Sequence, residues 1–313
     1  MTAHADLDIA VNAAQDEYDQ LVVSSTATAE QLATAKAEIL RLQAIIDSLV
    51  KPPPVDPPPV EVPSTLPKIP FKPPTLTNPT TIDLTGKTGG IVLDTTKDYI
   101  LKLPKDKAWK NGSGLNISGG HNVVVIGGLV DVADGSNGVR RAGYFQKATG
   151  TVHVEGVKFF SSTQATLTEG INISAPDAVI QIANCDIATP CSGSYATNHA
   201  DILQTWNGPK TLRVFGLKGK SNYQCMFLNA QDTNAAAQPI EGSWTLDRID
   251  VQGGAYTLWL VPPPGSIKIG AQVHAYGGKG LWKPEMWPGV KTSAPTEDFV
   301  PNAGLAYTTP SYL

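Results

Sequence analysis

The chain has 313 residues, of which 41% are hydrophobic and 17% are charged, and its formal net charge is -4. The 29 Gly and 25 Pro disfavour an all-helical protein, and the small net charge lacks the basic footprint of a nucleic-acid-binding protein. No apolar run is long enough to span a membrane, and the N-terminal residues lack the pattern of a secretory signal. We therefore expect no nucleic-acid partner and no membrane insertion.

Residues 1–50 contain neither Gly nor Pro, and apolar residues recur there every three or four positions. This period predicts helix, interrupted by the poor helix formers around Ser25, so we expect two helices, about 5–23 and 28–50. Thr28 and a Gln three residues later form a possible capping box at the start of the second helix.

The apolar stripe of these helices needs a partner, because a lone helix of this length is marginal in water. One interpretation is an amphipathic helix docked on its own body. We favour a short coiled coil that joins several chains, with Ile39 and Leu42 at its seam, since the segment that follows would hold the helix away from the body.

Residues 51–80 include twelve Pro and no Gly. Proline removes a backbone donor and restricts its neighbours, so this segment cannot form a helix or an inner strand. The composition predicts a semi-rigid polyproline II spacer, with a ligand for Pro-recognising domains as the alternative.

The body, residues 81–275, carries an internal repeat with spacings of 28, 28, 32, 32 and 23 residues. One apolar column comprises Val124, Val152, Ile180, Leu212, Trp244 and Ile267. A second apolar column, two residues on, comprises Ile126, Val154, Ile182, Val214, Leu246 and Ile269. A third column, four residues on from the first, is rich in residues that tolerate positive φ and comprises Gly128, Gly156, Asn184, Gly216, Arg248 and Ala271.

Alternate apolar residues followed by a bend predict short strands that turn into one another. A unit of this size cannot bury its apolar face alone, whereas stacked copies can. We therefore predict a mainly β fold, a right-handed parallel β-helix of about seven coils, preceded by the coiled coil and the Pro-rich linker. The alternative, an antiparallel sandwich, would need symmetric hairpin signals that the sequence lacks. Residues 81–110 would form the first coil, and the irregular residues 276–313 a cap or an inter-chain contact.

The most polar cluster of the body is the segment from Asn198 to Trp206. In a strand, His199 and Asp201 share a face, while Gln204 falls on the other face unless a bulge intervenes. A His beside a carboxylate can transfer protons or form half of a metal site, and an indole can stack on a sugar. We take His199, Asp201, Gln204 and Trp206 as the candidate binding residues, with a structural polar ladder as the alternative.

No catalytic residue, metal ligand set or cofactor site is predicted. Cys185 lies in an apolar column and is expected to pack in the core. We expect no catalytic or metal-binding role for Cys191 and Cys225. His121 and His153 adjoin strand starts and are expected at the surface.

Columns such as Val152/Val154 and Ile180/Ile182, with bends such as Asn184, resemble the pectate-lyase-like superfamily of right-handed parallel β-helices. The order of helical segment, Pro-rich spacer, β-helix and irregular C-terminal segment is similar to that of bacteriophage tail fibres, tail spikes and minor tail proteins. The resemblance implies a virion protein, made in the host cytoplasm, that forms homotrimers. It also implies attachment to other virion proteins through the N-terminal part and binding of host surface polysaccharide by the body.

Two further functions stay open. The first is a polysaccharide lyase or hydrolase with a groove near His199 and Asp201. The enzymes of the superfamily use clustered acids, or calcium with an Arg or Lys base, and neither pattern is evident in this sequence. The second alternative is a fibre that is attached to the capsid instead of the tail.

Overall fold

The computed structural model describes residues 28–50, 67–132, 140–162, 168–193, 199–230, 242–260 and 266–313. The chain divides into two compact units, Met1–Val62 and Pro63–Leu313. Within the described residues, no helix is long and apolar enough to cross a membrane.

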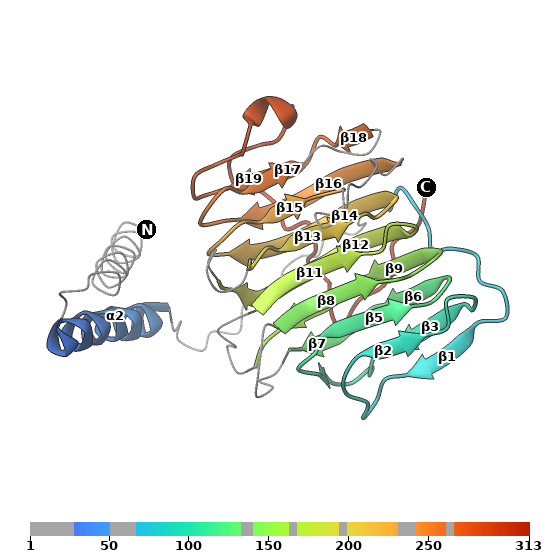
Figure 1. Cartoon of the computed structure of the whole chain (residues 1–313), viewed down its shortest axis with the longest axis horizontal. Helices are drawn as coiled ribbons and strands as arrows, with labels where there is room; N and C mark the ends of the chain where they lie inside the picture. The colour runs from blue at the N-terminus through green and yellow to red at the C-terminus, as the bar shows by residue number, and fades with distance from the viewer. Residues whose placement is uncertain are drawn as a thin grey trace. The chain divides into compact units, whose positions relative to one another are not determined.

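The described part of the first unit is one helix, α2, Ala29–Val50 (Figure 1). Its start is capped as predicted: the backbone N–H of Gln31 donates to Thr28 Oγ1 (3.2 Å), and the Thr28 N–H donates to Gln31 Oε1 (2.8 Å). Leu42 is buried and Ile39 half-buried, whereas Leu40 is 63% exposed, so the proposed seam is the less exposed side of α2. The predicted helix 5–23 lies outside the described residues, and the coiled coil is not confirmed.

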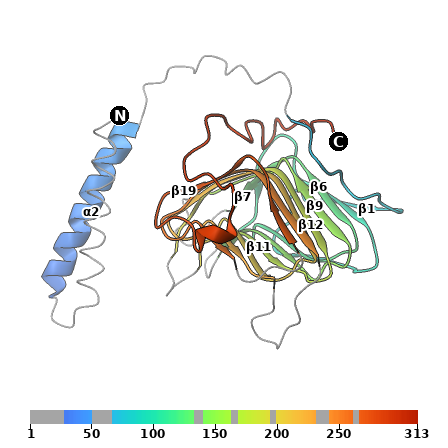
Figure 2. The ribbon, with the colours of Figure 1, turned by 90° about the horizontal axis from the view of Figure 1, so that it is seen from above.

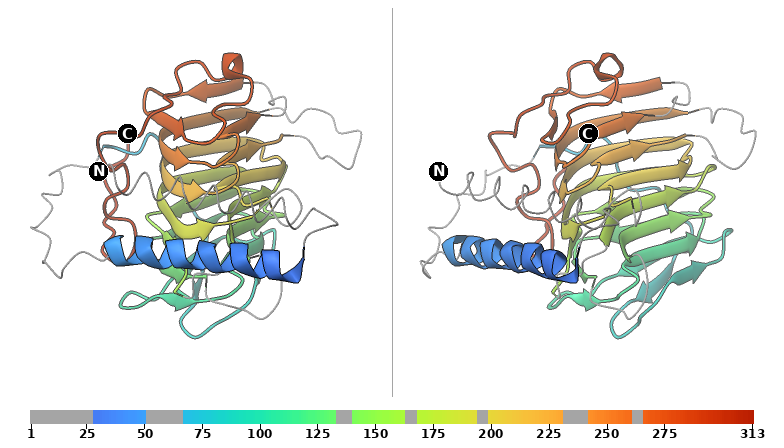
Figure 3. Two further views of the ribbon diagram at one scale, coloured as in Figure 1. Left: turned by 90° about the vertical axis from the view of Figure 1, so that its left-hand side faces the viewer. Right: turned by 60° about the vertical axis from the view of Figure 1, so that its left-hand side comes forward.

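The second unit is a parallel β-solenoid of about five turns (Figures 1 and 3). All strand pairs in the described residues are parallel, which excludes the antiparallel sandwich. Short strands at both ends extend the stack, and the predicted count of about seven coils is not confirmed. Its right-handed sense stays a prediction.

Three ladders of stacked strands form the walls of the solenoid. The first ladder comprises β1 (Thr80–Asp83), β3 (Tyr99–Lys102), β6 (Val123–Ile126), β9 (Thr151–Glu155), the first parts of β12 (Val179–Cys191), β14 (Thr211–Ser221) and β16 (Ser243–Gln252), and β18 (Ser266–Ile269). The second comprises β4 (Trp109–Lys110), β7 (Leu129–Asp131), β10 (Lys158–Phe160), the later parts of β12, β14 and β16, and β19 (Val273–Tyr276). The third comprises β2 (Ile91–Leu93), β5 (Leu115–Gly119), β8 (Arg140–Gln146), β11 (Thr168–Ser174), β13 (Leu203–Asn207), β15 (Met226–Leu228) and β17 (Leu258–Leu260).

The predicted apolar columns are correct from β9 onward. Val152, Ile180, Leu212, Trp244 and Ile267 are consecutive partners in the first ladder, and the first four are fully buried. In β6 the prediction was wrong by one residue, because Val123 pairs with Val152 and Val125 with Val154. Ile126 is accordingly 43% exposed.

The predicted bends lie between the first and second ladders. Gly128, Gly156, Asn184, Gly216 and Arg248 all have positive φ. At Gly156 a side chain is excluded for a second reason, because an added Cβ would overlap the ring of Tyr307. The bend column is therefore confirmed except at Ala271, which has no positive φ.

Two segments outside the ladders cover the first ladder (Figure 2). The chain before β1 packs Ile69 and Phe71 against Ala183 and Phe215, so this end of the predicted 51–80 spacer lies on the body. Residues 51–66 are outside the described residues.

The C-terminal residues have two roles. Trp287, which follows a short 3₁₀ helix (Pro284–Met286), is buried in the core. Further on, residues 300–313, which we call the return segment, run back along the first ladder, where Gly304 accepts from the Gly128 N–H (3.1 Å) and donates to the Gly156 carbonyl (2.9 Å). Near the C-terminus, the Ile69 N–H donates to the Ser311 carbonyl (3.1 Å), and the Leu313 N–H donates to the Ile69 carbonyl (3.0 Å). We call this pairing the clasp.

His153 is 0% exposed, and the ring of Phe71, from the segment before β1, packs edge-on to it with ring centroids 6.2 Å apart, so the expectation that His153 lies at the surface was wrong. His121 is exposed, and its Nδ1 lies 2.9 Å from Asp98 Oδ1.

Candidate functional site

The four predicted binding residues lie at the start of β13, in the third ladder. Asp201 and Gln204 are each 1% exposed, whereas His199 and Trp206 are half-buried. The His199 ring packs on Tyr223, with ring centroids 5.6 Å apart. The four residues are therefore close in the chain, but they do not present one open face to a ligand.

A bulge before β13 explains this arrangement. The N–H groups of Ile202 and Leu203 both donate to the Cys225 carbonyl, at 2.7 and 3.0 Å, and both side chains are fully buried. Two successive inward residues shift the alternation by one position. Gln204 consequently lies on the outward side of the ladder while remaining covered.

Asp201 has a carboxylate neighbour, Glu169, on the preceding turn, and we call these two residues the acidic pair. Glu169 Oε2 accepts from Arg141 Nε (2.9 Å) and from Asn172 Nδ2 (2.6 Å). Among the described residues, neither carboxylate oxygen of Asp201 has a hydrogen-bond partner. Burial, and then the charge of Glu169, raise the pKa of Asp201 well above its usual value. Burial also raises the pKa of Glu169, against the opposing effect of Arg141.

Buried amides complete this polar cluster. Asn172 and Gln204 are partners on neighbouring strands, and each is 1% exposed. Asn172 Oδ1 and both polar side-chain atoms of Gln204 find no hydrogen-bond partner in the part of the chain that the structure describes. Unpaired buried polar atoms are costly, so they mark a place where a hydroxyl-bearing ligand or an ordered water would be stabilised.

The two amides belong to a longer outward-facing row of the third ladder, the amide–aromatic row. Its members, in ladder order, are Asn116, Tyr144, Asn172, Gln204, Phe227 and Trp259. They alternate along their strands with buried core residues, so their side chains point away from the core.

The row ends in an aromatic cluster at β17. The Trp259 and Trp282 rings are stacked, with centroids 4.4 Å apart and an interplanar angle of 2°. Tyr256 lies edge-on to Trp282 at 5.0 Å, and Phe227 lies 6.5 Å from Trp259. All four rings are half-buried, so part of each aromatic surface is open to a ligand.

The sequence interpretation missed most of this row. The same repeat could have found it, because Asn116 and Asn172 occupy equivalent positions 56 residues apart, and Gln204 follows 32 residues later. Glu169 gave no local signal, since it lies three residues before Asn172 at the corner of the solenoid.

Within the described residues, no group of three or more His, Cys, Asp or Glu is placed to hold a metal ion. Cys185, Cys191 and Cys225 are free and buried. Burial raises the pKa of the Cys185 thiol to about 12 and raises those of the other two as well, which disfavours their reactive thiolate forms.

Comparison with known proteins finds no matching family model, no similar curated protein and no similar solved structure.

Proposed function

We propose that the solenoid binds a cell-surface glycan along the amide–aromatic row. The single observation that supports this proposal is the succession of amide and aromatic side chains on one outward line of the third ladder, ending in the stacked Trp259 and Trp282. Amides bond sugar hydroxyls in either direction, since they carry both a donor and an acceptor. Aromatic faces cover the apolar faces of sugar rings.

The repeat of the row suits a polymer. Neighbouring strands of a ladder lie about 4.8 Å apart, so the half-buried members of the row, Asn116, Tyr144, Phe227 and Trp259, can contact an extended glycan on either side of the covered Asn172 and Gln204. Each contact is weak, and several contacts on one chain reinforce one another.

We further propose that the whole chain is a bacteriophage tail fibre, tail spike or minor tail protein that binds host polysaccharide. Support comes from the order of its parts: a capped helix, a Pro-rich stretch and a parallel β-solenoid. In this proposal α2 joins chains into a homotrimer and attaches them to other virion proteins, and linked bodies gain avidity. A fibre attached to the capsid has the same order of parts and is the alternative location.

The experiment is a binding measurement on the purified chain with a panel of bacterial surface polysaccharides. Trp259→Ala is expected to weaken binding about tenfold or more, because it removes a central aromatic contact. Val92→Ala, at an exposed position near the other end of the third ladder, serves as the control. Equal affinity of Trp259→Ala and the unaltered chain for every bound glycan would refute the proposed site, and Trp206→Ala then tests the segment first predicted.

A second candidate function, polysaccharide hydrolysis, is favoured by the acidic pair. Glycosidases combine a protonated carboxyl as general acid with a second carboxylate. The raised pKa of Asp201 favours the protonated form that a general acid needs. New reducing ends from a bound polysaccharide, lost in both Asp201→Asn and Glu169→Gln, would establish this activity, whereas binding without new ends would leave glycan binding alone.

A further inference from the structure

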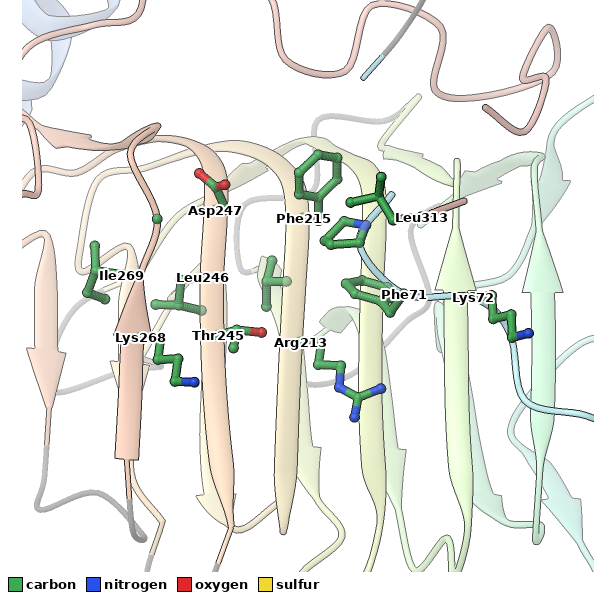
Figure 4. A pocket seen from close by; sticks show the side chains of 13 residues that line it. Phe71, Lys72, Arg213, Phe215, Thr245, Leu246, Asp247, Lys268, Ile269 and Leu313 are labelled. Atoms are coloured by element: carbon green, nitrogen blue, oxygen red, sulfur yellow. The ribbon is translucent and has the colours of Figure 1, made fainter. Parts of the chain in front are cut away.

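A groove of 630 Å³ crosses the first ladder, on a different wall from the amide–aromatic row. Its floor comes from β14, β16 and β18, and Phe71, Lys72 and Leu313 border it (Figure 4). The side chains of Arg213, Thr245 and Lys268 occupy the same register position on these three neighbouring strands. The groove therefore places a hydroxyl between two cations.

The cations of the groove are not neutralised by acids. Among the described residues, Arg213, Lys268 and Lys72 form no ion pair with a carboxylate. The groove does contain Asp247, but it lies away from the two cationic tips (Figure 4). Asp247 Oδ1 already accepts from the N–H groups of Arg248 (2.9 Å) and Gln272 (3.1 Å).

Arg213 is held in place by Gln181 on the neighbouring strand. The Gln181 amide oxygen accepts from Arg213 Nη1 (3.0 Å), while its amide nitrogen donates to His153 Nδ1 (2.8 Å) and to the Lys72 carbonyl (3.1 Å). These partners leave only one orientation for the amide. The remaining guanidinium donors face the groove without a described partner, and a planar guanidinium suits an oxyanion.

We propose that this groove binds an anionic glycan whose carboxylate or phosphate groups contact Arg213 and Lys268. Two strand spacings, about 10 Å, separate the backbones of these residues, so a polymer with repeated oxyanions can contact both cations at once. Thr245 supplies a hydroxyl between the charges. Gln181 acts as a positioning residue. The site shares no residue with the amide–aromatic row, so it does not depend on the proposed function.

The test uses the full chain and three polymers at several salt concentrations. Hyaluronate presents carboxylates, poly(glycerol phosphate) presents phosphates, and esterified hyaluronate lacks the charge. The chain is expected to bind at least one anionic polymer more tightly than the ester, with affinity that falls as salt rises.

Arg213→Gln and Lys268→Gln are each expected to lower that affinity about tenfold, because each removes a charge-assisted contact. Lys107→Gln, an exposed cation outside the groove, is the matched control and is expected to change little. Lys268 is itself exposed, so its variant keeps the test valid should Arg213→Gln fail to fold.

Gln181→Glu tests the positioning role, because it sets a carboxylate beside Arg213. It is expected to reproduce the loss seen in Arg213→Gln, with no further loss when the two changes are combined.

Absence of binding to both anionic polymers, or an equal loss in Lys107→Gln, would overturn the proposal. Normal binding in both groove variants would do the same. Trp259→Ala should not alter this binding, which separates the present site from the amide–aromatic row.

Discussion

The Tyr307 hydroxyl donates a hydrogen bond to Glu155 Oε1 over 2.8 Å and thereby joins the return segment to the first ladder. Tyr312 donates to the other oxygen of Glu155, also at 2.8 Å, and His153 Nε2 lies 2.8 Å from that same oxygen. Because the Gln181 amide nitrogen donates to His153 Nδ1, the hydrogen that His153 directs at Glu155 is on Nε2. Every partner of Glu155 is thus a donor.

Tyr307→Phe is expected to lower the free energy of unfolding by about 1.5–3 kcal/mol at pH 7, since it removes a hydrogen bond to a buried carboxylate. Burial raises the pKa of Glu155, but the bonds from His153 and the two tyrosines outweigh it and lower the pKa below 4.5. The stabilisation is therefore present above the unfolded-state pKa and is lost as pH falls through the lower folded-state value.

Chemical denaturation at pH 7 and at pH 3 to 4 checks the Tyr307 prediction. Tyr144→Phe is the control, because its hydroxyl makes no hydrogen bond among the described residues. A pH-independent difference would show that Glu155 is not the group through which Tyr307 acts.

Asp201→Asn should stabilise the fold at neutral pH. The folded-state pKa of Asp201 is raised, so its contribution to stability is complete below the unfolded-state value and declines as pH rises through the folded-state value. Between the unfolded-state and folded-state pKa values of Asp201, the stability gained by the variant should grow by about 1.4 kcal/mol for each pH unit. Above the folded-state pKa the gain should stay constant. Unfolding curves between pH 4 and 8 measure it, with Asp177→Asn, at an exposed position, as the control. A flat difference would mean that Asp201 is not desolvated.

Val125→Asp is expected to prevent folding, because it buries an unpaired charge in the core. Ile126→Asp, at the neighbouring position, which is 43% exposed, should cost less than about 1 kcal/mol. Circular dichroism and thermal unfolding of the pair test the register of β6. If the two variants behaved in the reverse order, the register first predicted from the sequence would be right.

Gly156→Ala should loosen the return segment. Both strain at φ +67 and overlap with the Tyr307 ring oppose the added Cβ, so we expect a loss of about 1–3 kcal/mol. Gly86→Ala is the matched control, since Gly86 has φ +73 but no atom within 4 Å of the added Cβ. Limited proteolysis should release peptides that contain Tyr307 faster from Gly156→Ala only. Equal release from both variants would assign the effect to backbone strain.

Much of the solenoid could be predicted from the sequence, because inward residues recur at equivalent positions. The register failed in β6, where Val123, Val124, Val125 and Ile126 are all apolar and β-branched. Such a run shows no alternation of apolar and polar residues, so the sequence does not decide which alternate residues point into the core. Asn184 illustrates the opposite case, because a polar residue with positive φ in a bend column marks its position unambiguously.

The candidate site was predictable only in part. Asp201 and Gln204 were identified from their local polarity, but their burial depends on the bulge at Ile202 and on neighbours one turn away. The expectation for His153 was wrong because Phe71, which packs on its ring, lies before the first strand and outside the repeat. Arg213 follows the core residue Leu212 in the repeat, so its outward position on the first ladder could have been predicted. The packing of Phe71 and Leu313 at the border of the groove could not, because neither residue belongs to the repeat.

The clasp has a mechanical consequence. Tension applied from the N-terminal side would reach Ile69, whose N–H and carbonyl both bond the C-terminal residues of the clasp, before it reached Thr80 in β1. The load would pass sideways into the wall near Ala183, where Ile69 and Phe71 are packed. Tension on the chain before Ile69 would thus shear the clasp, while β1, the terminal strand of the first ladder, stayed unloaded.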